Sequence, residues 1–232
     1  MFPLGDENPT KRVAVVNWAL IALNLMAFAL ELLFGERFIV QWSFIPARFS
    51  ALLSGSGDPQ ALATVFTAMF LHAGWSHIIG NMLFLWIFGD NVEDRFGSVP
   101  YLIFYLLCGL GATAAQYATD RTSLAVNLGA SGAISGVMGA YVIMFPRALV
   151  RFFVWPFSLF LGIFRIPAVL MLGVWFILQL LPAFQSLRSM GDEAGGVAYW
   201  AHVGGFVVGL VLVFFFRPRR EPGLPNYGGY RR

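Results

Sequence analysis

Ser131 lies between glycines in the stretch Gly129-Ala130-Ser131-Gly132, at the start of an apolar run that ends near Met144. A serine hydroxyl is a weak nucleophile until a nearby base takes its proton. Glycines beside it permit a tight turn and leave backbone N–H groups uncovered. At the first turn of a helix, such groups favour a developing negative charge. The stretch therefore predicts a nucleophilic serine, and the alternative is a helix cap followed by packing glycines.

His202 is the candidate base, because an ionisable residue inside a membrane segment is a functional candidate. It lies in Ala201-His202-Val203-Gly204-Gly205, and Gly209 follows in the same apolar run. Faces of small residues let two helices approach closely, and such faces follow both His202 (Gly205, Gly209) and Ser131 (Gly132, Gly136, Gly139). We therefore expect Ser131 and His202 to form a catalytic dyad. A buried histidine bonded to a backbone carbonyl is the alternative.

A third, acidic member of this pair is not evident. No Asp or Glu lies near this depth in the second, fourth, fifth or sixth apolar run. Asp120, Asp192 and Glu193 fall in loops. We therefore expect His202 to be held by packing rather than by a carboxylate, unlike a Ser-His-Asp triad.

His77 and Asn81 lie four residues apart, on one face of a helix. Both can donate hydrogen bonds, so we expect them to stabilise the oxyanion of a tetrahedral intermediate, by about 3–4 kcal/mol for a single good donor. His72, near the start of the same run, is expected to bond loop backbone. The alternative is a metal site made of the three histidines, but the sequence lacks a His-Glu-x-x-His pattern and a carboxylate ligand at that depth. No metal site is therefore predicted.

Glu93 and Arg95 lie in the stretch 91–97, which we predict to be a loop after the second apolar run. This loop is far from Ser131. A structural, hydrogen-bonding role at the turn between the second and third helices is therefore expected rather than a catalytic one.

Composition places the chain in the membrane class. Of its 232 residues, 58% are hydrophobic and 12% are charged, whereas a soluble domain carries about 25% charged residues. A membrane-spanning helix needs roughly 20 mostly apolar residues. We therefore expect an all-α polytopic membrane protein, a six-transmembrane-helix bundle whose helices cover 13–33, 64–88, 100–118, 129–145, 167–184 and 199–216.

Lysine and arginine indicate the orientation, because cytoplasmic loops carry an excess of them. With the N-terminus cytoplasmic, 11 of the 15 basic residues lie inside and 4 lie outside. Both the N and C termini are therefore predicted to be cytoplasmic. This orientation brings Ser131, His72, His77 and His202 to the outer ends of their helices, so that polar residues from distant positions converge at one depth.

One domain is expected, flanked by short polar ends. The predicted parts are a cytoplasmic N-terminal segment (1–12), a six-helix domain (13–216) and a disordered basic cytoplasmic tail (217–232). The loops 34–63 and 146–166 are rich in aromatic residues and are interpreted as interfacial segments. The polar loop 185–197 directly precedes His202 and is interpreted as a cap over the site.

Together these motifs resemble the rhomboid intramembrane serine proteases, over the second to the sixth helix. The resemblance rests on four motifs in order: His72-x4-His77-x3-Asn81, Glu93-x-Arg95, Gly129-Ala130-Ser131-Gly132 and Ala201-His202-x2-Gly205-x3-Gly209. It implies a rhomboid-like bundle with Ser131 as nucleophile and His202 as base. It also implies an oxyanion hole made of His77, Asn81 and the backbone N–H of Ser131. The other motif residues would support the structure: His72, Glu93, Arg95, Gly129, Gly132, Gly205 and Gly209.

The resemblance also implies partners and a location. The substrates would be single-pass transmembrane proteins, cut near the outer leaflet at small residues. The lipid bilayer would be the other partner, with no nucleic acid and no cofactor, and the minimal layout suggests a bacterial inner membrane. The sequence leaves the oligomeric state open.

Two departures and two rivals complete the interpretation. Many rhomboids have an aromatic residue four positions after the nucleophile, where this chain has Ser135, and a Trp-Arg pair in the first outer loop, which this chain lacks. One rival is a binding relative without activity, but it would lack the serine or the histidine. The other is a small transporter, which would require ionisable residues at several depths.

Overall fold

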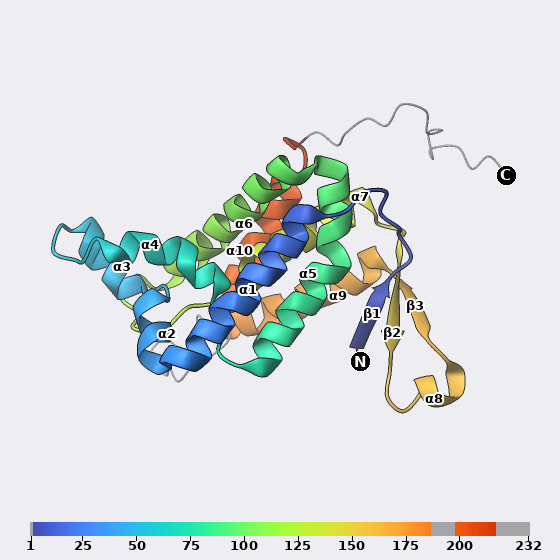
Figure 1. The fold of residues 1–232 in the computed structure, drawn as a ribbon, viewed down its shortest axis with the longest axis horizontal. Coiled ribbons are helices and arrows are strands. Elements are labelled where there is room, and N and C mark those ends of the chain that lie inside the picture. The colour runs from blue at the N-terminus through green and yellow to red at the C-terminus, as the bar shows by residue number, and fades with distance from the viewer. Residues whose placement is uncertain (1, 187–197, 217–232) are drawn as a thin grey trace.

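Helices make up most of the chain, whose computed structural model describes residues 2–186 and 198–216 (Figure 1). Six of them follow the six apolar segments in order: α1 (Val15–Phe34), α5 (Trp75–Phe96), α6 (Ser98–Thr119), α7 (Ser131–Met144), α9 (Ala168–Ser186) and α10 (Tyr199–Leu212). The predicted cap loop falls largely, and the predicted C-terminal tail entirely, outside the described residues.

Three of these helices, α1, α6 and α9, are long and apolar enough to cross a membrane. A fourth candidate span is the bent pair of Gln60–Phe70 and α5, whereas α7 and α10 are apolar but shorter. The chain is therefore a mostly helical membrane protein with three or four candidate spans among the described residues. The count of six spans and the cytoplasmic orientation of the termini stay predictions.

The helix predicted over 64–88 is broken. α4 (Gln60–Thr67) and the 3-10 helix η1 (Ala68–Phe70) end before a short non-helical stretch, and α5 starts after it with a bend of 75°. Gly74, at the break, has a φ of +156°, a backbone conformation that residues with a side chain rarely adopt. The break therefore depends on glycine at this position.

The break and the length of α5 (Trp75–Phe96) change the place of three predicted residues. His72 lies in the break rather than on the helix that carries His77, and Glu93 and Arg95, predicted in a loop, lie in the last turns of α5. The buried Glu93 carboxylate accepts the backbone N–H groups of Val16 and Asn17 (3.0 and 2.7 Å) and the Ser98 hydroxyl (2.7 Å). It thus caps the first turn of α1, where a negative charge is favoured. The Arg95 guanidinium lies 5.6 Å from the centre of the Phe145 ring.

The long loop between α1 and α5 contains α2 (Glu36–Trp42) and α3 (Pro46–Leu53) as well as α4. It is joined to the segment that leads into α7. Phe44 and Asn127 exchange two backbone hydrogen bonds, of 3.0 and 2.8 Å. The loop therefore fixes the approach of the chain to Ser131.

A small antiparallel sheet corrects the prediction of an entirely helical protein. β1 (Phe2–Asp6) pairs with β2 (Leu149–Phe153), which pairs with β3 (Phe164–Pro167), and the short α8 (Ser158–Leu161) lies at the tip of the β2–β3 hairpin (Figure 1). Alternate residues of β2, Val150 and Phe152, are buried in the core. Helical periodicity could not reveal this sheet, because β2 pairs with β1, a strand far away in the sequence.

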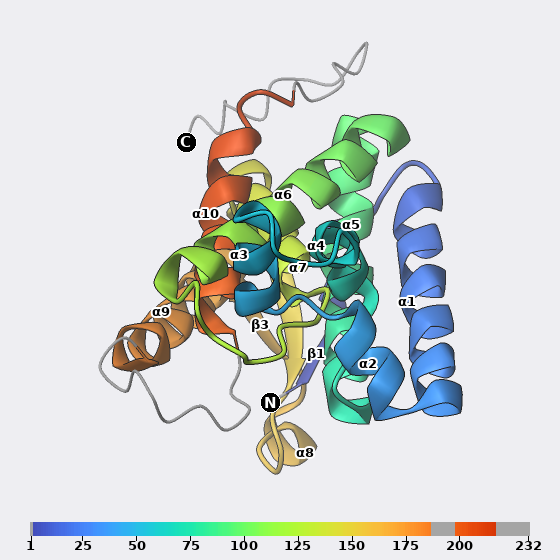
Figure 2. The same ribbon diagram turned by 90° about the vertical axis from the view of Figure 1, so that its left-hand side faces the viewer.

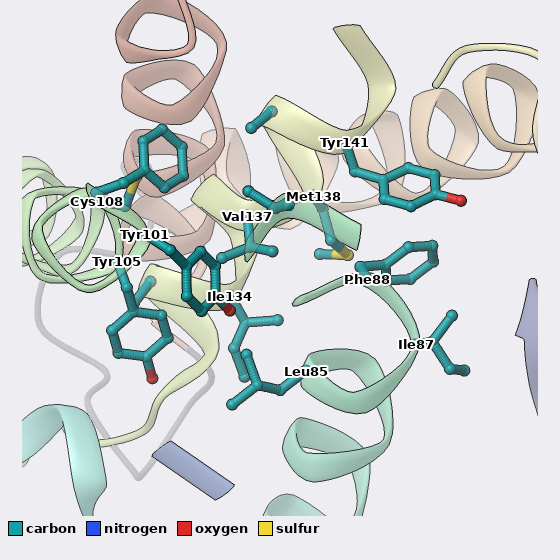
Figure 3. Packing of buried hydrophobic residues seen from close by; sticks show 14 of the residues in the cluster. Leu85, Ile87, Phe88, Tyr101, Tyr105, Cys108, Ile134, Val137, Met138 and Tyr141 are labelled. Carbon is teal, nitrogen blue, oxygen red and sulfur yellow. The ribbon is translucent and has the colours of Figure 1, made fainter. Parts of the chain in front are cut away.

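The core is built around α7, in which every residue from Gly132 to Tyr141 is buried. Figure 3 shows Ile134 and Met138 of α7 against Leu85 and Phe88 of α5. The ring of Tyr141 meets that of Phe88 edge to face at 4.9 Å. A short helix that is buried all round is held by its neighbours, so α7 places Ser131 on a rigid support.

At the end of α7 opposite to Ser131, β1 joins the bundle through the Asp6 carboxylate. It accepts hydrogen bonds from the Tyr141 hydroxyl and from the Asn91 side-chain amide (3.1 Å for the latter). Burial raises the pKa of Asp6 above its ordinary value of 3.8, although these bonds and the nearby Arg151 oppose the change. The folded state therefore holds the proton of Asp6 more tightly than the unfolded chain does.

Asp6→Asn is expected to keep or raise the melting temperature at pH 7. With a raised pKa in the folded state, stability is present below pH 3.8 and is lost as the pH rises through the folded pKa. Asparagine removes this loss and keeps an acceptor oxygen for Tyr141. Asp6→Leu, in contrast, removes the acceptor of the Tyr141 hydroxyl and should cost about 1–3 kcal/mol. Thermal unfolding in detergent at pH 4 and pH 7 measures both, and an Asn variant as unstable as the Leu variant would contradict this account.

Candidate active site

Ser131 is the first residue of α7, where backbone N–H groups have no partner within the helix. Gly129, two residues before it, has a φ of +127° and donates its N–H to the carbonyl of Ala68 (2.8 Å). A Cβ atom at Gly129 would lie 2.8 Å from His77 Nε2. Glycine at this position therefore permits both the turn into α7 and the close approach of His77.

His202 lies in the first turn of α10 and reaches Ser131. Its Nε2 atom is 2.7 Å from the Ser131 Oγ atom, within the range needed for a base that takes the serine proton. The preceding residue, Ala201, donates its N–H to the side chain of Gln116 on α6 (3.2 Å). This bond fixes the start of α10 beside α7.

Glycines set the distance between α7 and α10. A Cβ atom at Gly205 would fall on the carbonyl of Gly132, and one at Gly209 would fall on the carbonyl of Gly136. A Cβ atom at Gly132 would lie 2.5 Å from Cβ of Ala112 on α6. The two helices thus touch backbone to backbone, which is what the short Ser131–His202 distance requires.

The other side of the His202 ring contacts a residue that the sequence did not point to. Its Nδ1 atom is 2.8 Å from Oε1 of Gln179, on α9. The signal that could have found Gln179 is its isolation as an amide within an apolar span. His202 is therefore bonded on both ring nitrogens rather than held by packing alone.

Aromatic rings of α9 and α10 surround His202 where many rhomboids use a residue of α7. The centres of the Trp175 and Tyr199 rings lie 6.1 and 6.4 Å from that of His202. Ser135, at the usual aromatic position, donates its hydroxyl to the carbonyl of Ser131 (2.6 Å). Trp175 of α9 thus lies near the His202 ring, while the Ser135 side chain bonds the backbone of α7.

His77 and Asn81, on the first turns of α5, bring donors toward Ser131. Nδ1 of His77 accepts the backbone N–H of Ala73 (3.3 Å), so the hydrogen of a neutral His77 ring is on Nε2. That is the atom next to Gly129. Nδ2 of Asn81 is buried and has no hydrogen-bond partner among the described residues. His77 Nε2–H is thus a donor close to the turn that leads into Ser131, and Asn81 is a buried donor one turn further along α5.

His72 is buried, and its backbone N–H donates to the Glu31 carboxylate of α1 (3.0 and 3.2 Å to the two oxygens). Its ring meets that of His77 edge to face, with 5.0 Å between the centres. The expected bond from the His72 side chain to loop backbone stays a prediction, while its backbone N–H bonds a carboxylate that the sequence did not single out. Glu31 thus ties the break before α5 to α1.

A small cavity of about 40 Å³ adjoins Ser131, enough for ordered water rather than for a large ligand. Residues of η1, α6, α7 and α10 line it, among them Met69, Thr113, Gln116, Ser131 and Ala201. Within the described ranges, no group of three His, Cys, Asp or Glu side chains could hold a metal ion. Ser131 therefore both contacts His202 and lines a small cavity.

Comparisons with known proteins identify the relatives of this chain. The family model described as Rhomboid domain matches residues 59–219. Rhomboid-like protein 11, chloroplastic, of Arabidopsis thaliana is 33% identical over 154 residues, which are 64% of this chain and 50% of that protein. RHOMBOID-like protein 6, mitochondrial, of the same plant is 30% identical over 163 residues, 70% of this chain and 46% of that protein. Rhomboid protein 1, mitochondrial, of Saccharomyces cerevisiae is 28% identical over 163 residues, 66% of this chain and 41% of that protein.

These relatives also correct one prediction. Their names place them in chloroplasts and mitochondria, so the predicted bacterial inner membrane is wrong, and the setting they support is a membrane without a named compartment. The helical layout that suggested a bacterial membrane carries no address, because the same bundle fits any bilayer of similar thickness. This chain spans about half the length of the curated relatives it matches. Since the family match covers more than half of its residues, including Ser131 and His202, the chain belongs to the rhomboid family.

Proposed function

We propose that this chain is an intramembrane serine endopeptidase in which Ser131 is the nucleophile and His202 the general base. The observation that carries the proposal is the 2.7 Å separation of Ser131 Oγ and His202 Nε2 across the contact of α7 and α10. Membership of the rhomboid family supports the same activity.

The first step is attack on the scissile peptide bond. Oγ of Ser131 bonds to the carbonyl carbon while its proton moves to Nε2 of His202. The carbonyl oxygen becomes an oxyanion, which the N–H of Ser131, Nε2–H of His77 and the Asn81 amide would stabilise. Two observations support this role: the tautomer of His77 set by Ala73, and the unpartnered donor of Asn81.

The second step releases the products. The C–N bond breaks as Nε2–H of His202 gives its proton to the leaving amine, and the acyl group stays on Ser131. A water molecule, deprotonated by His202, then attacks the acyl carbon and frees the serine. The cavity beside Ser131 offers space for this water, since its volume is about 40 Å³.

The substrates are proposed to be single-pass transmembrane proteins, cleaved at small residues near the membrane surface. The position of Ser131 supports this, because it is the first residue of the buried helix α7 rather than a residue at its middle. The bias of lysine and arginine supports a topology with both termini on the cytoplasmic side and the site on the other.

Covalent labelling by a fluorophosphonate tests the proposed nucleophile. In liposomes, the protein should cleave a single-pass reporter, and the probe should form a bond from Ser131 Oγ to phosphorus while fluoride leaves. Because a general base contributes about 10²–10⁴-fold, His202→Ala should slow this labelling at least 100-fold. Mass spectrometry of the peptide that holds Ser131 reads out the adduct.

Two results would overturn the proposal. One is a label on a different serine, and the other is equal labelling of the wild type and His202→Ala. If the protein is labelled but cuts none of several single-pass reporters, the reactive dyad stands and the proposed substrate class fails. If it is neither labelled nor active, a binding relative without activity is the better description.

A further inference from the structure

Gln179 is the one polar side chain of α9 between Ala168 and Ala183. α9 is a candidate membrane span, and an amide placed there without hydrogen bonds is costly. Its Oε1 atom lies 2.8 Å from Nδ1 of His202. The contact therefore gives this amide oxygen a partner, and that partner belongs to the proposed dyad.

The chemistry of the imidazole ring defines what this contact does. Nε2 of His202 can accept the Ser131 proton only if its lone pair is free, so the hydrogen of the neutral ring must be on Nδ1. A carbonyl oxygen accepts and never donates, so Oε1 of Gln179 pairs with Nδ1–H and repels a bare Nδ1. Gln179 thus favours the one tautomer that lets His202 act as a base toward Ser131.

We propose that Gln179 is a positioning residue, which holds the Nδ1–H tautomer and the ring orientation of His202. As a statement about catalysis it rests on the proposed protease function. The amide replaces the carboxylate of a Ser-His-Asp triad in orientation but not in charge. It supplies the hydrogen-bond acceptor for Nδ1–H of His202 that an acidic residue provides in a triad, and the sequence showed no such acidic residue.

The position of Gln179 on α9 adds a second consequence. In the apolar stretch of α9, 17% is buried, whereas 33% is buried in the corresponding stretches of α1 and α6. α9 lies at the edge of the bundle beside α10 (Figure 2). Its docking includes the stack of Phe176 on Phe206 of α10, with ring centres 4.6 Å apart. Because the acceptor for Nδ1–H comes from α9, the orientation of the base depends on this helix staying docked on α10.

Kinetics of three variants test the proposal. Gln179→Leu keeps a similar side-chain size without an acceptor, Gln179→Glu keeps an acceptor oxygen, and Gln185→Leu makes the same exchange at an exposed position of the same helix. Loss of one buried hydrogen bond should lower kcat about tenfold in Gln179→Leu with little change in KM. Gln179→Glu should recover most of this loss, and Gln185→Leu should match the wild type.

The ring nitrogens give a readout that does not depend on activity. The chain has three histidines, so ¹⁵N labelling of their rings yields few signals, and His202→Ala identifies those of His202. In the wild type, Nδ1 should carry the proton at neutral and higher pH. In Gln179→Leu, the signals of His202 should move toward a mixture of the two tautomers, whereas those of His72 and His77 stay.

Each result decides something. An unchanged His202 tautomer in Gln179→Leu, with full kcat, would overturn the proposal. An equal loss of kcat in Gln185→Leu would also overturn it, because it would indicate a packing effect on α9. If the wild type cleaves nothing, the protease function fails. The nitrogen signals then still show whether Gln179 sets the tautomer of His202.

Discussion

Ser131→Ala is expected to abolish proteolysis while the fold is retained. The hydroxyl is the atom placed 2.7 Å from His202 Nε2, and methyl in its place cannot bond to a substrate carbonyl carbon. In a soluble serine protease, loss of the nucleophile lowers kcat by about 10⁶-fold. A fall of about 10⁴-fold or more is therefore expected here, below detection in most assays. Cleavage of a single-pass reporter in liposomes by wild type and variant, at equal amounts of folded protein, measures it.

Ser135→Ala is the matched control, one turn further along α7. Its hydroxyl bonds the carbonyl of Ser131, which also accepts a backbone N–H within the helix, so its loss should change kcat by less than about threefold. Retained cleavage in Ser131→Ala would exclude Ser131 as the nucleophile. Equal loss in both variants would instead point to damage of α7.

Gly205→Val is expected to have the second largest effect on proteolysis, because it increases the distance between α7 and α10 without removing a catalytic group. A Cβ atom at Gly205 would occupy the place of the Gly132 carbonyl, and backbone cannot move aside as a flexible side chain can. α10 must therefore shift away from α7, and His202 shifts with it. A misplacement of 1 Å in a catalytic group costs about 10²-fold in rate, so kcat/KM should fall about 100-fold or more. Overpacking should also cost about 1–3 kcal/mol of stability.

A matched control is available on α9. Gly173 is also a helical glycine, but a Cβ atom there would meet nothing within 4 Å. Gly173→Val should therefore keep both activity and melting temperature. Cleavage rates together with thermal unfolding separate the two effects. Full activity in Gly205→Val would mean that the close approach of α7 and α10 is not needed for the Ser131–His202 contact.

Several features of this protein were readable from local patterns alone. Apolar runs predicted the helices, because a helix that meets lipid or core must bury its polar backbone in its own hydrogen bonds. Spacing of three and four residues predicted that small residues line the faces behind Ser131 and His202, since such residues share one side of a helix. Membership of the rhomboid family, expected from the order of these motifs, is confirmed by the family match.

Tertiary structure decided the features that depend on distant partners. The pairing of β1 with β2 joins residues far apart in the sequence, such as Phe2 and Phe153, so no local periodicity predicts it. The hydrogen bond from the His72 backbone N–H to the Glu31 carboxylate, next to the break at Gly74, forms only because α1 packs beside α5. Gln179 looks like an isolated amide in the sequence, and only the docking of α9 on α10 places its oxygen 2.8 Å from His202. Residue types and helical spacing thus determined the candidates for chemistry, whereas contacts between helices determined which side chains orient them.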